Sequence, residues 1–108
     1  MNKVIEAATI FSVQDSIEYA AGSVVSKTIV KKPTGTITLF AFDAGEGLSE
    51  HTAPFEAVVQ ILDGTAEITI DGKPFTVETG AGIILPAQVP HALKALERFK
   101  MMLTMIKS

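Results

Sequence analysis

The stretch GEGLSEHTAPFEAVVQILDG, residues 45–64, decides the fold together with the stretch GAGIILPAQVPHALKA, residues 80–95. His51 lies in the first stretch and His91 in the second, and they are the only two histidines among 108 residues. In both stretches, glycine and proline bound short apolar runs, a pattern typical of strands joined by turns. The pattern therefore predicts one strand within each stretch, and each stretch also contains one histidine.

The sequence around these stretches predicts more short strands. Runs of β-branched and apolar residues predict strands over residues 24–30, 36–42, 57–62, 65–70, 73–77, 83–85 and 99–106. Asp63-Gly64 and Asp71-Gly72 are typical hairpin dipeptides, so we expect an antiparallel meander through them. One short helical turn is expected near residue 15. Short, evenly spaced strands indicate an all-β sandwich or barrel, and the length suits one domain over residues 1–108.

Composition and charge exclude several classes of protein. Hydrophobic residues make up 47% of the chain and charged residues 19%, which is typical of a globular domain. The net charge is -3 and the basic residues form no block beyond Lys31-Lys32, so we expect no nucleic-acid partner. The chain has no cysteine, which excludes disulfides and thiolate ligands. Residues 1–14 contain no apolar run of membrane-spanning length, so we expect a cytoplasmic protein with no membrane partner.

The first stretch resembles the first motif of small cupins. That motif runs from a glycine through five residues to His-x-His, then through three or four residues to a glutamate, and then through six residues to a glycine. Here Gly45 is followed by five residues and His51, and Gly64 closes the motif.

The second stretch resembles the second cupin motif. That motif is a glycine, five residues, Pro-x-Gly, two residues, a histidine, three residues and an asparagine. Gly80, Pro86 and His91 keep its spacing, whereas Gln88 replaces the glycine and Ala95 replaces the asparagine. The resemblance implies a double-stranded β-helix, or jelly-roll, cupin barrel with motifs near residues 45–64 and 80–95.

The resemblance also implies a metal site, made in the family by two histidines of His-x-His, one Glu or Gln, and the histidine of the second motif. His51 and His91 match two of these ligands, whereas Ala53 and Ala57 replace the other two and Glu56 is one position off. Neighbouring strand residues face opposite sides, so Glu56 can reach the site only if the preceding loop bulges. Two imidazoles are fewer than the three protein ligands that metal sites usually use. We expect no bound metal or other cofactor; if a divalent transition metal binds, its ligands are His51 and His91.

Strand alternation predicts that the two histidines face one pocket, because residues two apart on a strand point to the same side. Ala53 and Ala57 leave volume beside them. Residues 99, 101, 103 and 105 form an apolar stripe of period two, which we interpret mainly as core, with Met101 also lining the pocket. The expected ligand is a small, mostly apolar molecule.

Two other classes of function stay open. One is a cupin enzyme of the dioxygenase, isomerase or epimerase type, using a metal or a histidine as general base. The epimerase branch resembles a histidine paired with an acid and a tyrosine, and the only tyrosine here is Tyr19. The other is a non-catalytic sensor or structural dimer. The resemblance implies a homodimer, with residues 24–30 as a strand that the two copies exchange. No catalytic residue is assigned.

Overall fold

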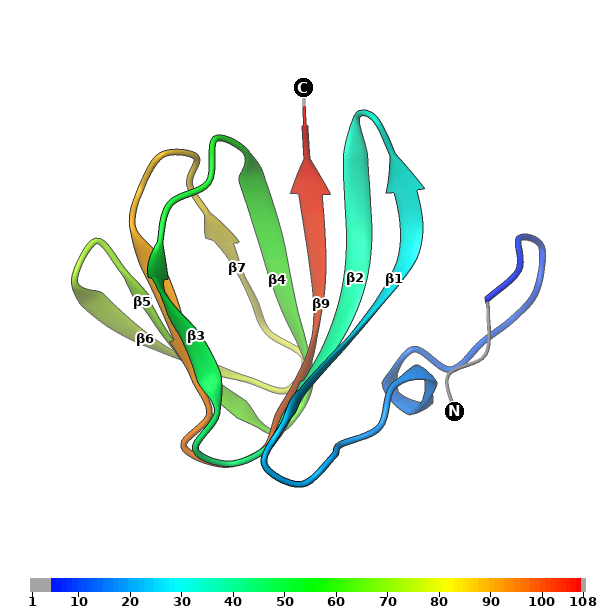
Figure 1. The fold of residues 1–108 in the computed structure, drawn as a ribbon, viewed down its shortest axis with the longest axis horizontal. Helices are drawn as coiled ribbons and strands as arrows, with labels where there is room; N and C mark the ends of the chain where they lie inside the picture. Colours follow the sequence, from blue (N-terminus) through cyan, green and yellow to red (C-terminus); the bar gives the residue numbers. More distant parts are fainter. Residues whose placement is uncertain (1–4, 108) are drawn as a thin grey trace.

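The computed structural model describes residues 5–107, and almost all of its regular structure is β (Figure 1). One 3-10 turn, η1 (Gln14–Ser16), precedes the strands. The strands in the described residues are β1 (Val24–Lys32), β2 (Gly35–Phe42), β3 (Gly47–His51), β4 (Glu56–Asp63), β5 (Thr65–Ile70), β6 (Lys73–Glu78), β7 (Gly82–Leu85), β8 (His91–Lys94) and β9 (Phe99–Ile106). The predicted all-β class is confirmed. No helix within residues 5–107 has the length and apolar character needed to cross a bilayer.

The strands form two antiparallel sheets. The larger sheet has the order β1-β2-β9-β4-β7, and the smaller has the order β3-β8-β5-β6. In Figure 1 the two sheets meet at the lower end and diverge toward the upper end, like the walls of a cup. The histidine-bearing strands β3 and β8 are paired neighbours in the smaller sheet.

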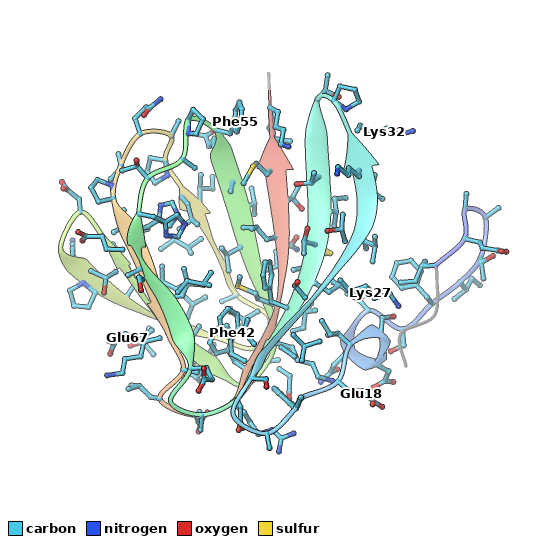
Figure 2. All side chains as sticks on the ribbon, viewed as in Figure 1. Glu18, Lys27, Lys32, Phe42, Phe55 and Glu67 are labelled. Atoms are coloured by element: carbon cyan, nitrogen blue, oxygen red, sulfur yellow. The ribbon has the colours of Figure 1, made fainter. Side chains whose placement is uncertain are left out.

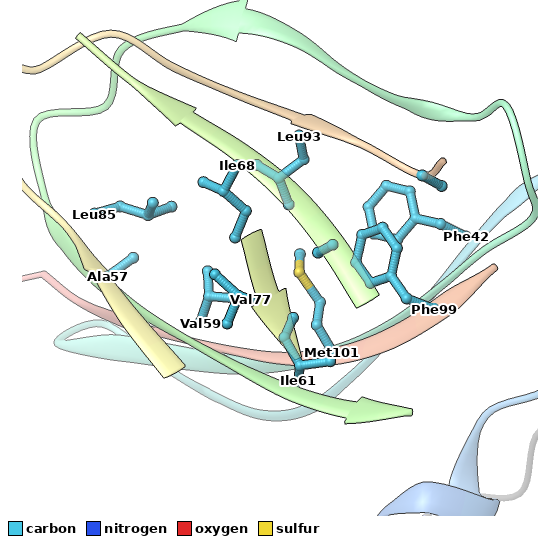
Figure 3. Packing of buried hydrophobic residues seen from close by; sticks show 12 residues of the cluster. Phe42, Ala57, Val59, Ile61, Ile68, Val77, Leu85, Leu93, Phe99 and Met101 are labelled. Atoms are coloured by element: carbon cyan, nitrogen blue, oxygen red, sulfur yellow. The ribbon is translucent and has the colours of Figure 1, made fainter. Parts of the chain in front are cut away.

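The main core fills the space between the sheets, because alternate residues of each strand point inward. Ile68 and Leu93 of the smaller sheet point toward Val59 and Met101 of the larger one (Figure 3). The Phe42 ring stacks on the Phe99 ring, with their centroids 4.5 Å apart. Phe42 lies toward the end where the sheets converge, whereas Phe55 lies at the opposite, upper rim (Figure 2). The core is therefore closed by aromatic rings at its base.

A second, smaller cluster lies on the outer face of the larger sheet. Residues 39 and 41 of β2 point outward, whereas the neighbouring Phe42 belongs to the main core. Ile17, just after η1, is fully buried against Leu39 and Ala41. The segment before β1 therefore packs across the back of this sheet and lies away from the space between the sheets.

The seven strands predicted from the sequence are confirmed, with boundary shifts of one or two residues. The hairpin at Asp71-Gly72 is also confirmed, since β5 pairs with β6 and both turn residues have positive φ. The meander through Asp63-Gly64 is wrong, because β4 and β5 belong to different sheets. Gly64 has a φ of 78°, and a Cβ at this position would collide with the carbonyl of Arg98. The dipeptide is therefore a corner where the chain changes sheet.

Candidate functional site

A bulge in β3 turns His51 toward the space between the sheets. Leu48 pairs with Leu93, and His51 pairs with His91, so three steps along β3 match two steps along β8. In a regular strand, residues three apart point to opposite faces. The extra residue in β3 reverses the alternation, as β-bulges do, and both Leu48 and His51 therefore line the same cavity.

The two imidazoles meet at the mouth of this cavity. Their Nε2 atoms are 3.1 Å apart, and the ring centroids are 4.4 Å apart with an angle of 68° between the planes. His91 is only 6% exposed, whereas His51 is exposed to solvent. The pair therefore has one buried and one accessible member.

A backbone carbonyl lies beside the Nδ1 atom of each histidine. The Nδ1 of His51 lies 2.7 Å from the carbonyl oxygen of Ser49, and the Nδ1 of His91 lies 3.1 Å from that of Val89. A carbonyl oxygen only accepts hydrogen bonds, so the ring nitrogen is the donor in each of these bonds. Two neutral imidazoles carry one ring hydrogen each, and they share these two hydrogens among the two carbonyl contacts and the contact between the Nε2 atoms.

The loops that follow β3 and β7 are tied together beside the histidines. The Gln88 N–H donates to the carbonyl of Ala53 over 2.8 Å. Gln88 has a φ of 65°, in the left-handed region that favours glycine. This is the position at which the resemblance implies a glycine. The backbone shape of the motif is therefore retained even though the residue differs.

The cavity has a volume of about 60 Å³. That is room for a small molecule or for about four to six water molecules. Apart from the two imidazoles its wall is apolar. The lining residues are Leu48, His51, Ala53, Phe55, Ala57, Leu85, His91, Leu93, Met101, Leu103 and Met105.

All five pocket residues singled out from the sequence, His51, His91, Ala53, Ala57 and Met101, lie in this lining. The stripe on β9 serves two purposes. Phe99 and Met101 are almost fully buried in the core, and Met101, Leu103 and Met105 line the cavity.

Sequence reasoning missed β3 and β8 as strands, and with them Leu48 and Leu93 as parts of the wall. Leu93 could have been found by alternation, since it is two residues beyond His91. Leu48 could not, because its orientation relative to His51 depends on the bulge.

The donor set does not fit the four-ligand metal site that the resemblance implies. The side chains of Ala53 and Ala57 carry no lone pair. Glu56 is exposed at the start of β4 and is absent from the cavity lining, whereas its neighbour Ala57 is buried and faces inward. No group of three or more His, Cys, Asp or Glu side chains within residues 5–107 is placed to hold a metal ion.

Tyr19 lies away from the histidines, in the cluster on the outer face of the larger sheet. Its hydroxyl donates to Asp63 Oδ2 over 2.6 Å, and the Arg98 guanidinium lies 3.8 Å from the ring centroid. Burial, together with the hydrogen bond to the Asp63 carboxylate, raises the pKa of Tyr19 above its usual range. Tyr19 therefore does not join the two histidines in an epimerase-like group.

Two facing antiparallel sheets, with paired histidine strands beside the cavity, define a jelly-roll barrel. The model of the Cupin domain family matches residues 38–107, which include both motifs. The chain belongs to the cupin family, and the predicted cupin barrel is confirmed.

Solved structures agree with this assignment. A protein of unknown function from Streptococcus pyogenes is 37% identical, with a TM-score of 0.91, over 98% of this chain and 93% of that one. A cupin 2 conserved barrel domain protein from Leptotrichia buccalis is 43% identical, with a TM-score of 0.87, over 90% of this chain and 47% of that one.

A curated relative is more distant. The protein named polyketide synthase CurC, from Streptomyces cyaneus, is 26% identical over 73 residues. The match covers 67% of this chain and 47% of the relative, so the chain spans about half the length of that protein.

Proposed function

We propose that this cupin binds a small, mostly apolar molecule between its two sheets, without a tightly held metal, and that His51 and His91 orient the molecule. The observation that carries the proposal is a cavity whose wall is hydrocarbon and thioether except for two converging imidazoles. Ligand sites are typically of this kind, with apolar walls and a few polar groups that set the orientation.

The small side chains of Ala53 and Ala57 support this function, because they leave space in the cavity. Ala57 is buried and faces the cavity beside Leu85, its partner in the pairing of β4 with β7. A larger side chain at this position would fill the space beside the histidines. The methyl groups of Ala53 and Ala57 thus leave room where the family resemblance implies a second histidine and a carboxylate.

Methionine methyl groups provide the test. Met101 and Met105 line the cavity, whereas Met102 packs in the outer cluster. We expect 3-methylbutan-1-ol, added to protein with ¹³C-labelled methionine methyls, to shift the Met101 and Met105 signals in a saturable way and to leave the Met102 signal in place. Ala57→Leu should abolish these shifts by filling the cavity.

Val58→Leu is the matched control. It introduces the same leucine side chain at the next position of β4, where the side chain points away from the cavity. It should keep the shifts. The proposal is wrong if no methionine methyl responds to the alcohol, or if folded Ala57→Leu protein responds as strongly as the unchanged protein.

The enzyme alternatives have less support from the residues near the cavity. Among the residues that the structure describes, the cavity lining contains no carboxylate or hydroxyl, and Tyr19 belongs to the outer cluster. A general-base role would therefore rest on the two histidines alone. Binding requires nothing beyond the groups already present.

We also propose that the protein forms a homodimer in the cytoplasm. The cysteine-free composition supports this location. Strand β1 is at an open edge of the larger sheet, and unpaired strand edges readily pair with a second chain. Apolar side chains are exposed beside it, with Ile10 fully exposed, Phe11 39% exposed and Val30 41% exposed. The mass of the protein in solution tests the dimer.

A further inference from the structure

The two walls of the cavity present different side chains at its open end. On the smaller sheet, His51 of β3 pairs with His91 of β8, so the two imidazoles stand side by side. On the larger sheet, Ala57 of β4 pairs with Met105 of β9 on one side and with Leu85 of β7 on the other. All five residues line the cavity. A row of two imidazoles on one sheet is therefore matched, on the other sheet, by a row whose middle member is an alanine.

The alanine leaves a narrow slot in the wall of the larger sheet. Directly paired residues of neighbouring strands have Cβ atoms about 4.5–5.5 Å apart, so the longer side chains of Met105 and Leu85 flank the single methyl group of Ala57. Both side chains extend further from the sheet than this methyl group does. The space over Ala57 therefore suits a flat molecule better than a branched one.

Rings and thioethers border this slot. Phe55 lines the cavity from the upper rim, in the loop that leads into β4 (Figure 2). The two imidazoles already meet edge to face, with 68° between their planes. Met101 is 1% exposed and lines the buried part of the cavity, and Met105 lies beside Ala57. Aromatic rings and methionine sulfur atoms both make favourable contacts with a further aromatic ring.

The aliphatic part of the lining does not discriminate between classes of apolar ligand. Leucine and alanine side chains stabilise a bound molecule mainly by removing its apolar surface from water, and this effect is similar for saturated and aromatic rings. The rings and the two thioethers add contacts that only an aromatic ligand makes. They therefore decide which class is preferred.

We propose that the molecule bound here carries a single aromatic ring with one small polar substituent; this rests on the proposed function. The ring occupies the slot over Ala57, between the imidazoles of one sheet and Met105 of the other, below Phe55. The polar substituent lies at the mouth, beside His51, which is exposed to solvent. A volume of about 60 Å³ suits one such ring and excludes a fused pair.

Benzyl alcohol and cyclohexylmethanol test this preference, because both are primary alcohols on a six-membered ring and only the first ring is aromatic. We expect both to shift the ¹³C-methyl signals of Met101 and Met105 in a saturable way, and benzyl alcohol to bind about tenfold more tightly. Its ring current should also move these signals further. Equal affinities, or tighter binding of cyclohexylmethanol, would overturn the aromatic assignment.

Met105→Leu isolates the contribution of one thioether, because leucine fills nearly the same volume and has no sulfur. The preference for benzyl alcohol, followed at Met101, should fall about threefold. Met102→Leu is the matched control, since it makes the same exchange on the same strand in the outer cluster, and it should keep the full preference.

Phe55→Leu removes the ring at the rim and should also lower the preference about threefold. A preference that is unchanged in both Met105→Leu and Phe55→Leu would show that these side chains do not contact the ring, and would overturn its placement in the slot.

The same titrations separate this proposal from the proposed function. If 3-methylbutan-1-ol and cyclohexylmethanol shift Met101 and Met105 and bind as tightly as benzyl alcohol, the cavity function stands and only the aromatic assignment fails. If none of the three alcohols shifts Met101 or Met105, the cavity function itself fails, and the aromatic assignment fails with it.

Discussion

At the scale of single residues, small departures from the family motifs alter the chemistry while the backbone is retained. Ala53 and Ala57 place methyl groups where the resemblance implies metal ligands, and both still line the cavity. Gln88 stands where the motif has glycine and adopts the left-handed conformation that glycine favours. The hydrogen bond from Gln88 to Ala53 holds the two loops together. The backbone conformation of the motif is therefore kept, at some cost in strain at Gln88.

Gln88→Gly tests this strain. A non-glycine residue in the left-handed region costs roughly 1–2 kcal/mol, and glycine gives back roughly 0.5–1 kcal/mol through its greater freedom in the unfolded chain. We expect the free energy of unfolding to rise by about 0.5–1 kcal/mol in urea denaturation. Ala87→Gly, at the adjacent position without positive φ, should lower it instead. A similar loss in both variants would show that Gln88 is not strained.

At the scale of elements, two features govern the site and its support. The bulge in β3 brings His51 to the inner face. The segment before β1 braces the back of the larger sheet, where the Tyr19 hydroxyl reaches Asp63 and the Lys100 ammonium donates to the carbonyl of Gln14 over 2.8 Å. This segment therefore stabilises β4 and β9 from behind without entering the cavity.

Tyr19→Phe measures how much the hydrogen bond between Tyr19 and Asp63 contributes to the free energy of unfolding. It removes the hydroxyl and keeps the ring under Arg98, so we expect a loss of about 1 kcal/mol in the free energy of unfolding. Because the folded protein holds the pKa of Tyr19 above its ordinary value near 10, the stabilising contribution is complete below that value and is lost as pH rises through the raised pKa.

The stability difference between the two proteins should therefore be constant from about pH 6 to 9 and shrink above about pH 10. Urea denaturation across this range provides the measurement. A difference that stays constant to the highest pH would contradict the assigned hydrogen bond.

At the scale of the whole molecule, the two sheets close on Phe42 and Phe99 at one end and leave a cavity toward the other. The larger sheet has two open edges, β1 and β7. The proposed dimer uses the β1 edge, where the exposed apolar residues of the preceding segment gather around a groove formed with residues 29–32.

Val30→Glu tests this edge, since it places a charge on the proposed interface. We expect the dimer dissociation constant, measured by light scattering over a dilution series, to rise at least about tenfold, because an unpaired charge is costly to bury. Ile84→Glu is the matched control on β7, at the other edge of the same sheet, and should leave it unchanged. A monomeric mass for the unchanged protein at every concentration would contradict the dimer.

Much of the fold could be predicted because its signals are local. Alternating apolar residues predicted seven strands, and Asp71-Gly72 predicted a hairpin. The prediction from Asp63-Gly64 was wrong, because the same kind of dipeptide also occurs at a corner between two sheets. At this corner the carbonyl of Arg98 leaves no room for a side chain at position 64. Local sequence does not report a contact with a residue that is so distant along the chain.

Residue types and their spacing were enough to predict an all-β fold, because these signals act locally. The resemblance of two motifs added the cupin barrel, the placement of His51 and His91 in those motifs, and the replacement of two expected ligands by alanine. The folded structure was needed to show that Leu48 and His51 face the same cavity, because the bulge between them exists only relative to the register of β8. It also places the two Nε2 atoms 3.1 Å apart and a backbone carbonyl beside each Nδ1 atom, contacts that composition and spacing do not describe.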